Sequence, residues 1–416
     1  MENARRPEPS FSDHQALIGV RATERLRRKA RLLAGRRVLH VNSTRQGGGV
    51  AEILSSLVPL MNEVGVEADW LVIEGTPEFF TFTKALHNAL QGERLQLGQE
   101  GMLLHREVAC ANAGRAQLGS YDLVIVHDPQ PLPLVELRRG ERWVWWCHID
   151  VSQPDPTAWA YMAPTVSEYD AAVFSLPEYA QVLAAPQRFI MPAIDPFSLI
   201  NRELSRTETG VHLARYGIPT DLPLVVQVGR FDKWKDPQGV IEAYCAATAR
   251  RPATLVLVGN TAADDPEGQE MYESVCAFSC ERILVIGADD PLLVNALQRR
   301  AAVVLQKSLR EGFGLTVSEA MWKGRAVIGG NVGGIRHQIV HDHTGFLAED
   351  VEEAARHIAD LLAQPDLRRT VGRRARERVR RRFLMTRLLE DWLDLMRELL
   401  ADQPRRASAP PLARAS

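Results

Sequence analysis

The stretch LHVNSTRQGGGVAEIL (Leu39–Leu54) joins a short apolar run to three consecutive glycines, after which an apolar-periodic segment begins. This order predicts a buried strand, a glycine loop and a helix. A P-loop is excluded because no Gly-Lys-Ser/Thr follows, and Glu52 stands where a G-x-G-x-x-G motif needs its last glycine. The loop therefore joins a strand's carboxyl end to a helix N-terminus, where α/β sheets bind ligands and free N–H groups favour anions. Three glycines favour close ligand approach, with a tight packing turn as the alternative.

Strand-like and helix-like segments alternate along most of the chain. The strand-like runs are about five residues long, rich in β-branched and aromatic residues, and rarely alternate with polar residues. Such runs are typical of strands buried on both faces of a parallel sheet. Amphipathic segments such as VAEILSSLVPLMNEVG and DPQGVIEAYCAATAR separate them, so we predict a doubly wound α/β fold. The ten runs lie within RVLHVN, DWLVIEG, DLVIVHD, RWVWWCHID, AAVFSL, PLVVQVGR, TLVLVGN, RILVIGAD, AAVVLQ and RAVIGG.

Ten strands are many for one sheet, and the segment Met191–Gly210 interrupts the pattern with two prolines and no sustained periodicity. We therefore predict two Rossmann-like domains. The predicted parts are an N-terminal domain (1–203, with a helical extension at 1–35), a C-terminal domain (204–384), a final helix (385–402) and a disordered tail (403–416).

Composition limits the possible partners. The formal net charge of the 416 residues is -2, which provides no global attraction for nucleic acid or an anionic membrane. No run approaches the ~18 apolar residues that span a bilayer, and the N-terminus lacks the apolar core of a signal peptide. Five cysteines without C-x-x-C spacing indicate reduced thiols. We expect a cytoplasmic protein without nucleic-acid or membrane partners; a homodimer is the oligomer we consider.

The second half contains two cations after a predicted strand. In VVQVGRFDKWKDP the strand ends near Gly229, and Arg230 and Lys235 follow before the next helix. A guanidinium fork and an ammonium point charge at a strand's carboxyl end can bind a diphosphate. Two exposed loop cations would give the same pattern.

The segment SLREGFGLTVSEAMWKG carries two glutamates, Glu311 and Glu319. Between them, Gly312, Phe313, Gly314 and Leu315 offer backbone N–H groups that lead into a helix. A glycosidase pair needs about 5–9.5 Å between its carboxyl groups, whereas eight helical steps would give roughly 12 Å. The two glutamates are therefore expected to contact different parts of one long ligand.

Together, GRFDKWK and EGFGLTVSE resemble the retaining glycosyltransferases of family 4, which have the GT-B fold. The resemblance covers about residues 36–385. It implies two Rossmann-like domains facing a central cleft, with the nucleotide-sugar on the C-terminal domain and the final helix (385–402) crossing back to the N-terminal domain. It also implies that Arg230 and Lys235 hold the donor diphosphate, that Glu311 contacts the transferred sugar, and that Glu319 contacts the ribose. Arg230, Lys235 and Glu311 are thus candidate catalytic residues, and the loop of Gly312, Phe313, Gly314 and Leu315 is a candidate donor-binding loop.

The N-terminal half is similar to one branch of that family. HVNSTRQGGGVAE, FTKALHNALQG, VHDPQPL and WCHID resemble the glucosyl-transferring trehalose synthases and the retaining trehalose phosphorylases. The resemblance implies that His148 contacts the donor sugar near the reaction centre, as a fourth catalytic candidate; a buried structural histidine is the alternative. Further candidate substrate-binding residues are Asn42, Gly47, Gly48, Gly49, His87, Asn88 and Asp150. Helix-face polarity for His87 and Asn88, and capping for Asp128 and Asp150, stay open.

The resemblance implies a retaining, reversible glucosyl transfer from ADP-, UDP- or GDP-glucose to glucose, which gives trehalose. No sequence feature nominates a carboxylate nucleophile, so we favour a front-face reaction in which the leaving diphosphate takes the acceptor's proton. No tightly bound cofactor and no metal ligand are expected, since two cations meet the diphosphate and no Asp-x-Asp motif accompanies them. Free Mg²⁺ could stimulate the reaction. The alternatives are a phosphorylase that uses inorganic phosphate, a transferase with another acceptor, and a nucleotide-binding regulator without chemistry.

Overall fold

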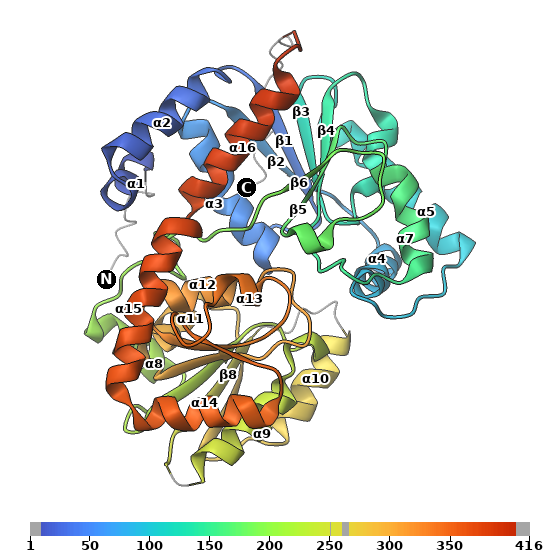
Figure 1. Cartoon of the computed structure of the whole chain (residues 1–416). Coiled ribbons are helices and arrows are strands. Elements are labelled where there is room, and N and C mark those ends of the chain that lie inside the picture. Colours follow the sequence, from blue (N-terminus) through green and yellow to red (C-terminus); the bar gives the residue numbers. More distant parts are fainter. Residues whose placement is uncertain (1–9, 250, 260–265, 405–416) are drawn as a thin grey trace. The chain divides into compact units, whose positions relative to one another are not determined.

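The computed structural model describes residues 10–249, 251–259 and 266–404 (Figure 1). The chain divides into two compact units, one made of Met1–Met191 with Met385–Ser416 and the other of Pro192–Leu384. This division falls before the boundary expected at 203/204. The segment after Pro192 belongs to the second unit because Ile194 forms a bridge with Leu384, and because Asn201 accepts a 2.8 Å hydrogen bond from the Lys323 ammonium.

The first unit contains a six-stranded parallel sheet in the order β2-β1-β3-β4-β5-β6. Its strands are β1 (Arg37–Asn42), β2 (Glu67–Val72), β3 (Leu123–His127), β4 (Arg142–Trp146), β5 (Ala171–Phe174) and β6 (Gln187–Phe189).

Helices cover both faces of this sheet. On one face, α16 packs on α2 and α3, and α3 packs on β1 and β2 (Figure 1). On the other face, α4, α5, α7 and η1 enclose a core that includes Trp143 and Trp145. The helical elements of this unit are α1 (Phe11–Ile18), α2 (Val20–Arg31), α3 (Gly49–Glu63), α4 (Pro77–Leu90), α5 (Gln99–Ala111), α6 (Ala113–Ala116), η1 (Leu132–Leu137), α7 (Pro156–Val166), η2 (Pro177–Tyr179) and α16 (Met385–Leu400).

The second unit contains another six-stranded parallel sheet, in the order β12-β11-β10-β7-β8-β9. Its strands are β7 (Leu224–Val228), β8 (Thr254–Gly259), β9 (Ile283–Gly287), β10 (Val303–Gln306), β11 (Ala326–Gly330) and β12 (Phe346–Ala348).

In this unit α9 and α14 pack together on one face, and α11 and α12 lie on the strands with α8 and α15 packed against them (Figure 1). The helical elements are α8 (Arg206–Arg215), η3 (Lys233–Lys235), α9 (Pro237–Thr248), α10 (Pro266–Cys276), α11 (Pro291–Arg300), α12 (Leu315–Trp322), α13 (Ile335–Gln338), α14 (Val351–Ala363) and α15 (Pro365–Arg382).

The predicted fold class, α/β with two doubly wound sheets, is confirmed, and each of the ten predicted runs overlaps one strand. The prediction missed β6 and β12, which are three-residue strands at sheet edges and too short for a periodic signal. No helix among the described residues is both long and apolar enough to cross a membrane. All five cysteines are free thiols. Most of the tail predicted at 403–416 lies outside the described residues.

Candidate functional site

In the second unit, Lys235 and Glu311 form an ion pair between two loops at the carboxyl edge of the sheet. Lys235 ends η3, just after β7, and Glu311 lies in the loop between β10 and α12. Their side chains are 19% and 13% exposed. The Ser308 hydroxyl also donates to Glu311 Oε2, at 3.2 Å. Three polar groups from two strand ends therefore meet at one point.

The η3 turn holds Lys235 in place through its neighbours. The buried Asp232 carboxylate accepts the Lys235 N–H at 3.0 Å, and the Gln227 amide donates to the Lys235 carbonyl at 2.8 Å. Asp236, with a left-handed φ of 50°, caps α9 and pairs with Lys307. The Lys235 backbone is thus fixed from both sides, while its side chain reaches Glu311.

Arg230, the second predicted diphosphate ligand, has a different environment. Its side chain is 47% exposed, and its guanidinium lies 3.7 Å from Asp232. Exposed pairs of this length contribute little to stability. Arg230 is therefore able to turn toward a ligand without loss of a strong contact.

Two glycines shape the loop from Glu311 to Leu315. Gly314 precedes α12 with a left-handed φ of 83°. A Cβ on Gly334 would lie 2.4 Å from the Phe313 Cα, so only glycine lets the loop after β11 pack so closely. The Gln338 amide donates to the Phe313 carbonyl at 2.5 Å, and the Gly334 N–H donates to the Glu311 carbonyl at 3.2 Å. The predicted donor loop is therefore held by hydrogen bonds and close backbone packing from the segment that follows β11.

Glu319 lies on α12 and is only 3% exposed. The Gln298 amide donates a long 3.4 Å hydrogen bond to its Oε2, because Lys323 holds the Gln298 oxygen at 2.7 Å and so turns the amide nitrogen toward Glu319. The estimate of about 12 Å between the two glutamates is based on a wrong assumption: the helix begins only at Leu315, so Glu311 lies outside it.

In the first unit, the glycine loop lies between β1 and α3, as predicted. Gly47 and Gly48 have left-handed φ values of 74° and 80°, whereas Gly49 begins the helix. A Cβ on Gly48 would meet no atom within 4 Å. The positive φ values alone are thus sufficient to explain why glycine occurs at positions 47 and 48, without a ligand near the backbone. No side chain caps α3, so its first N–H groups face the loop.

Asn42 closes the strand before this loop. Its amide nitrogen donates to the Thr44 carbonyl and its oxygen accepts the Trp70 indole N–H, both at 2.7 Å. The Arg45 guanidinium stacks over the same indole at 4.2 Å. The Asn42 amide is therefore already occupied by contacts that hold the loop.

His148 follows β4, and its side chain is the first of three histidine side chains linked by hydrogen bonds. His148 Nε2 lies 3.0 Å from His127 Nδ1, and His127 Nε2 lies 3.0 Å from His40 Nδ1. Burial lowers the pKa of both His40 and His148 to about 3 and holds that of His127 well below its ordinary value. All three rings are therefore neutral at physiological pH.

The sheet register explains this chain. Parallel pairing places His40 beside Ile125, and His127 beside Trp146. Because side chains alternate along a strand, these residues share the face that α16 covers. The Trp392 ring of α16 lies 4.7 Å from the Trp146 ring.

Asp128 and Asp150 both make local contacts. Asp128 has a left-handed φ of 59° and accepts the His148 N–H at 2.8 Å; burial raises its pKa to about 7. Asp150 is buried and accepts hydrogen bonds from the Ser152 N–H and hydroxyl, at 3.0 and 2.6 Å. The contacts of Asp150 form a local turn in the loop, while Asp155 caps the following helix α7.

His87 and Asn88 lie in the last turn of α4 and are half-buried and buried, respectively. The Ala89 carbonyl beside them accepts the Asp155 N–H at 2.8 Å, which ties this end of α4 to the loop after β4. The two residues are therefore on an element that contacts the loop containing His148 and Asp150.

The sequence interpretation missed His40, His127 and Ser308. His40 and His127 lie in the predicted runs RVLHVN and DLVIVHD, but only the observed strand order β1-β3-β4 brings them onto one face of the sheet with Trp146. Ser308 lies in the loop between β10 and α12, where the sequence has no strand or helix periodicity that would predict the direction of its side chain.

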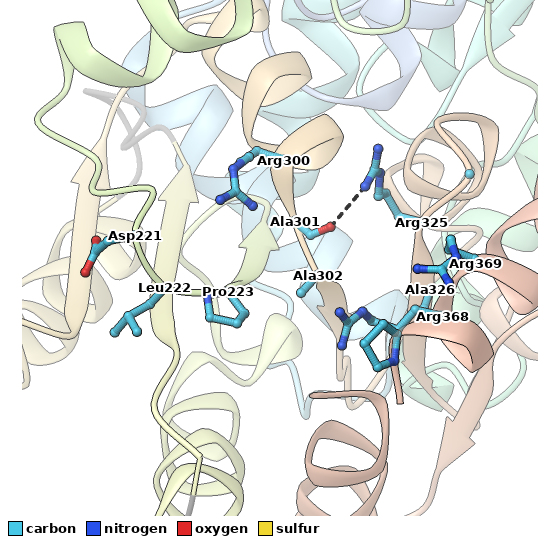
Figure 2. A pocket seen from close by; sticks show the side chains of 12 residues that line it. Asp221, Leu222, Pro223, Arg300, Ala301, Ala302, Arg325, Ala326, Arg368 and Arg369 are labelled. Carbon is cyan, nitrogen blue, oxygen red and sulfur yellow. Dashed lines mark hydrogen bonds between the residues drawn. The ribbon is translucent and has the colours of Figure 1, made fainter. Parts of the chain in front are cut away.

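A separate pocket lies at the opposite, amino edge of the second sheet. It is lined by Pro223, Ala302 and Ala326, at the beginnings of three strands, and by four arginines: Arg300, Arg325, Arg368 and Arg369 (Figure 2). Arg325 donates to the Ala301 carbonyl at 3.4 Å, and Arg369 pairs with Asp366 on the surface. None of the predicted site residues lines it.

Two domain families match the chain. The family described as trehalose synthase, N-terminal domain, matches residues 40–181, and the family described as glycosyl transferases group 1 matches residues 211–378.

Individual proteins extend these matches. The trehalose synthase of Pyrococcus horikoshii is 44% identical, covering 94% of this chain and 96% of its own. The trehalose phosphorylase of Pleurotus pulmonarius is 27% identical, covering 81% of this chain but 54% of its own. Among solved structures, the sucrose-phosphate synthase of Thermosynechococcus elongatus is 23% identical, with a TM-score of 0.69 over 88% of this chain and 100% of that chain. This last likeness shows the fold.

Proposed function

The chain belongs to the trehalose synthase family and is a glycosyltransferase; from this premise we propose that it makes α,α-trehalose from a nucleoside-diphosphate glucose and glucose. The observation that carries the proposal is 44% identity over 94% of this chain to a trehalose synthase. The proposed transfer is reversible and retains the α configuration of the donor.

On the donor side, Lys235 and Arg230 bind the diphosphate. The Lys235 ammonium is neutralised by Glu311, and an incoming diphosphate competes for it. Once Lys235 turns to the phosphates, the Glu311 carboxylate can accept hydrogen bonds from hydroxyls of the transferred glucose in place of the Lys235 ammonium. The ion pair thus couples diphosphate binding to sugar binding.

The nucleoside side of the donor is assigned to α12. Glu319 has one long hydrogen bond from Gln298, and a ribose diol would offer its carboxylate two better donors. The backbone N–H groups of Gly312, Phe313, Gly314 and Leu315 precede the same helix, whose N-terminal dipole favours phosphate. This arrangement supports a nucleotide donor over inorganic phosphate, which has no ribose.

Acceptor glucose is assigned to the first unit, with His148, His87, Asn88 and Asp150 near it and the Gly47–Gly49 loop beside the phosphates. In the proposed step, the bond between the anomeric carbon and the phosphate oxygen breaks. A bond forms from the acceptor hydroxyl oxygen on the same face, and its proton passes to the leaving diphosphate. Arg230 and Lys235 stabilise the charge that develops there. No resident metal is required, and free Mg²⁺ could assist.

The test is an assay of purified protein with ADP-, UDP- or GDP-glucose plus glucose, with products identified by NMR. We expect α,α-trehalose and nucleoside diphosphate, and in reverse nucleotide-glucose from trehalose and nucleoside diphosphate. A Glu311→Gln variant is the matched control for contaminating activity. Glucose 1-phosphate formed rapidly from trehalose and phosphate would favour the phosphorylase instead. Trehalose formed from maltose without nucleotide would identify an isomerase, and either result would overturn the proposal.

A further inference from the structure

The histidine chain runs from the carboxyl edge of the first sheet into its interior. His148 is half-buried, whereas His127 and His40 are 1% and 0% exposed. The two N···N distances of 3.0 Å are hydrogen bonds, so each requires one protonated and one unprotonated nitrogen.

This requirement couples the three rings. A neutral imidazole has one N–H nitrogen and one nitrogen with a lone pair, so the tautomer of one ring determines the tautomer of the ring bonded to it. Only two arrangements satisfy both hydrogen bonds. All three protons are on Nδ1, which points the chain outward, or all three are on Nε2, which points it inward. The inner end of the chain decides between them.

At the inner end, His40 Nε2 is buried without a hydrogen-bond partner among the described residues, and so are the indole N–H groups of Trp146 and Trp392. The Trp392 ring lies 6.4 Å from the His40 ring, and the Trp146 ring lies 5.1 Å from the His127 ring. Around these atoms the described residues therefore present N–H donors and no hydrogen-bond acceptor. A third N–H there would be another unsatisfied donor, whereas a lone pair on His40 Nε2 suits the positive field of the indole N–H groups and ring edges.

We infer that His40, His127 and His148 all carry their proton on Nδ1, so that His127 and His40 are positioning residues that fix His148 as a hydrogen-bond donor at its outer nitrogen. The role of this donor rests on the proposed function: His148 Nδ1–H binds a sugar oxygen and does not act as a base. This agrees with a mechanism in which the diphosphate takes the acceptor's proton.

The Nδ1–H form is the minor tautomer of free histidine in water, so finding it in all three rings would not be expected without the hydrogen-bonded chain. Protein labelled with ¹⁵N-histidine would be examined without substrate by two-bond ¹H–¹⁵N correlation, which separates protonated from unprotonated ring nitrogens. Single substitutions assign the signals among the 11 histidines. We expect protonated Nδ1 and bare Nε2 in all three rings. A protonated Nε2 on His148 would overturn the inference, whatever the enzyme's substrate.

Two variants of the middle residue test positioning. His127→Leu breaks both hydrogen bonds, so His148 should shift toward Nε2–H and turnover should fall about tenfold, the value of one hydrogen bond. His127→Gln can accept from His40 and donate to His148, and should restore the Nδ1–H form and most of the activity. Thermal melts show whether either variant is misfolded. An unchanged His148 tautomer in folded His127→Leu would refute the positioning role, while the wild-type spectrum tests the chain without any variant.

Discussion

Lys235 and Glu311 are 76 residues apart in sequence and form an ion pair that joins the loop after β7 to the loop after β10. Both side chains are largely buried, so each charge is stabilised by the other. The same two residues carry the proposed contacts to diphosphate and sugar. The proposed donor site therefore lies where two adjacent strands, β7 and β10, end.

Lys235→Ala should reduce transfer about 10²–10³-fold, because a charged contact to the developing diphosphate charge is lost. It should also lower the melting temperature, since Glu311 keeps a poorly solvated charge. Adding Glu311→Gln in the Lys235→Ala background should recover stability but not activity. The measurements are steady-state rates and thermal melts. Arg369→Ala is the matched control, because Arg369 is an exposed cation at the opposite edge of the same sheet. Normal turnover in Lys235→Ala would remove the diphosphate role.

Arg230→Ala should leave the melting temperature unchanged, because its side chain is 47% exposed and its contact with Asp232 is long. Activity should nevertheless fall strongly, by about 10²-fold, if the guanidinium binds the diphosphate. Activity equal to that of the Arg369→Ala control would show that Arg230 is only a surface cation.

Gly48→Ala tests why glycine occurs before α3. With φ 80° and ψ 160°, Gly48 lies in a backbone region that essentially only glycine adopts, so any side chain should cost about 1–3 kcal/mol, although space for a Cβ is open. Gly48→Asn should cost about as much, because asparagine tolerates the left-handed helical region near a ψ of about 47° and not this one. Gly49→Ala should not destabilise the protein, because Gly49 is the first residue of the helix. The comparison requires melts and rates for all three. Lost activity in a Gly48→Ala variant that melts like the wild type would instead indicate that a ligand approaches the backbone.

Glu319→Gln should raise the KM for the nucleotide-sugar more than it lowers kcat. The ribose contact is made both before and during the reaction, so its loss removes uniform binding. Inhibition by free nucleoside diphosphate should weaken in parallel. A collapse of kcat at unchanged donor affinity would contradict the ribose assignment.

The sequence predicted the parts of the molecule that depend on local pattern. Buried strands, the glycine loop after β1 and the loop at Glu311 are all marked by short stretches of characteristic residues. Both loops lie at the carboxyl end of a strand, as expected. Contacts set by packing were not predictable in the same way. The pairing of Lys235 with Glu311 depends on β7 and β10 being neighbours, and the positive φ of Gly48 depends on the turn into α3. The histidine chain needed the strand order β1-β3-β4, which no single run reveals.

The last prediction concerns acid stability of the first unit. Because the folded protein holds His40, His127 and His148 neutral, the unfolded chain binds more protons below its ordinary histidine pKa of about 6.5. The contribution of these three histidines to the free energy of unfolding is therefore fully present above that pH and is lost as the pH falls below it. Asp128 opposes this trend: its pKa is raised to about 7, so its contribution weakens the fold as the pH rises from about 4 to 7. Three histidines outweigh one carboxyl, and the melting temperature should fall on acidification from pH 7 to 5.

Two variants should change this slope in opposite directions. His40→Leu removes one buried imidazole and should make the loss of stability below pH 6.5 shallower. Asp128→Asn keeps an oxygen for the His148 N–H and tolerates the left-handed backbone, but removes the opposing carboxyl, so the loss should become steeper. Tryptophan fluorescence suits the measurement, because six of the eight tryptophans belong to the first unit. Equal slopes in both variants and the wild type would show that these buried groups do not govern the pH dependence of folding.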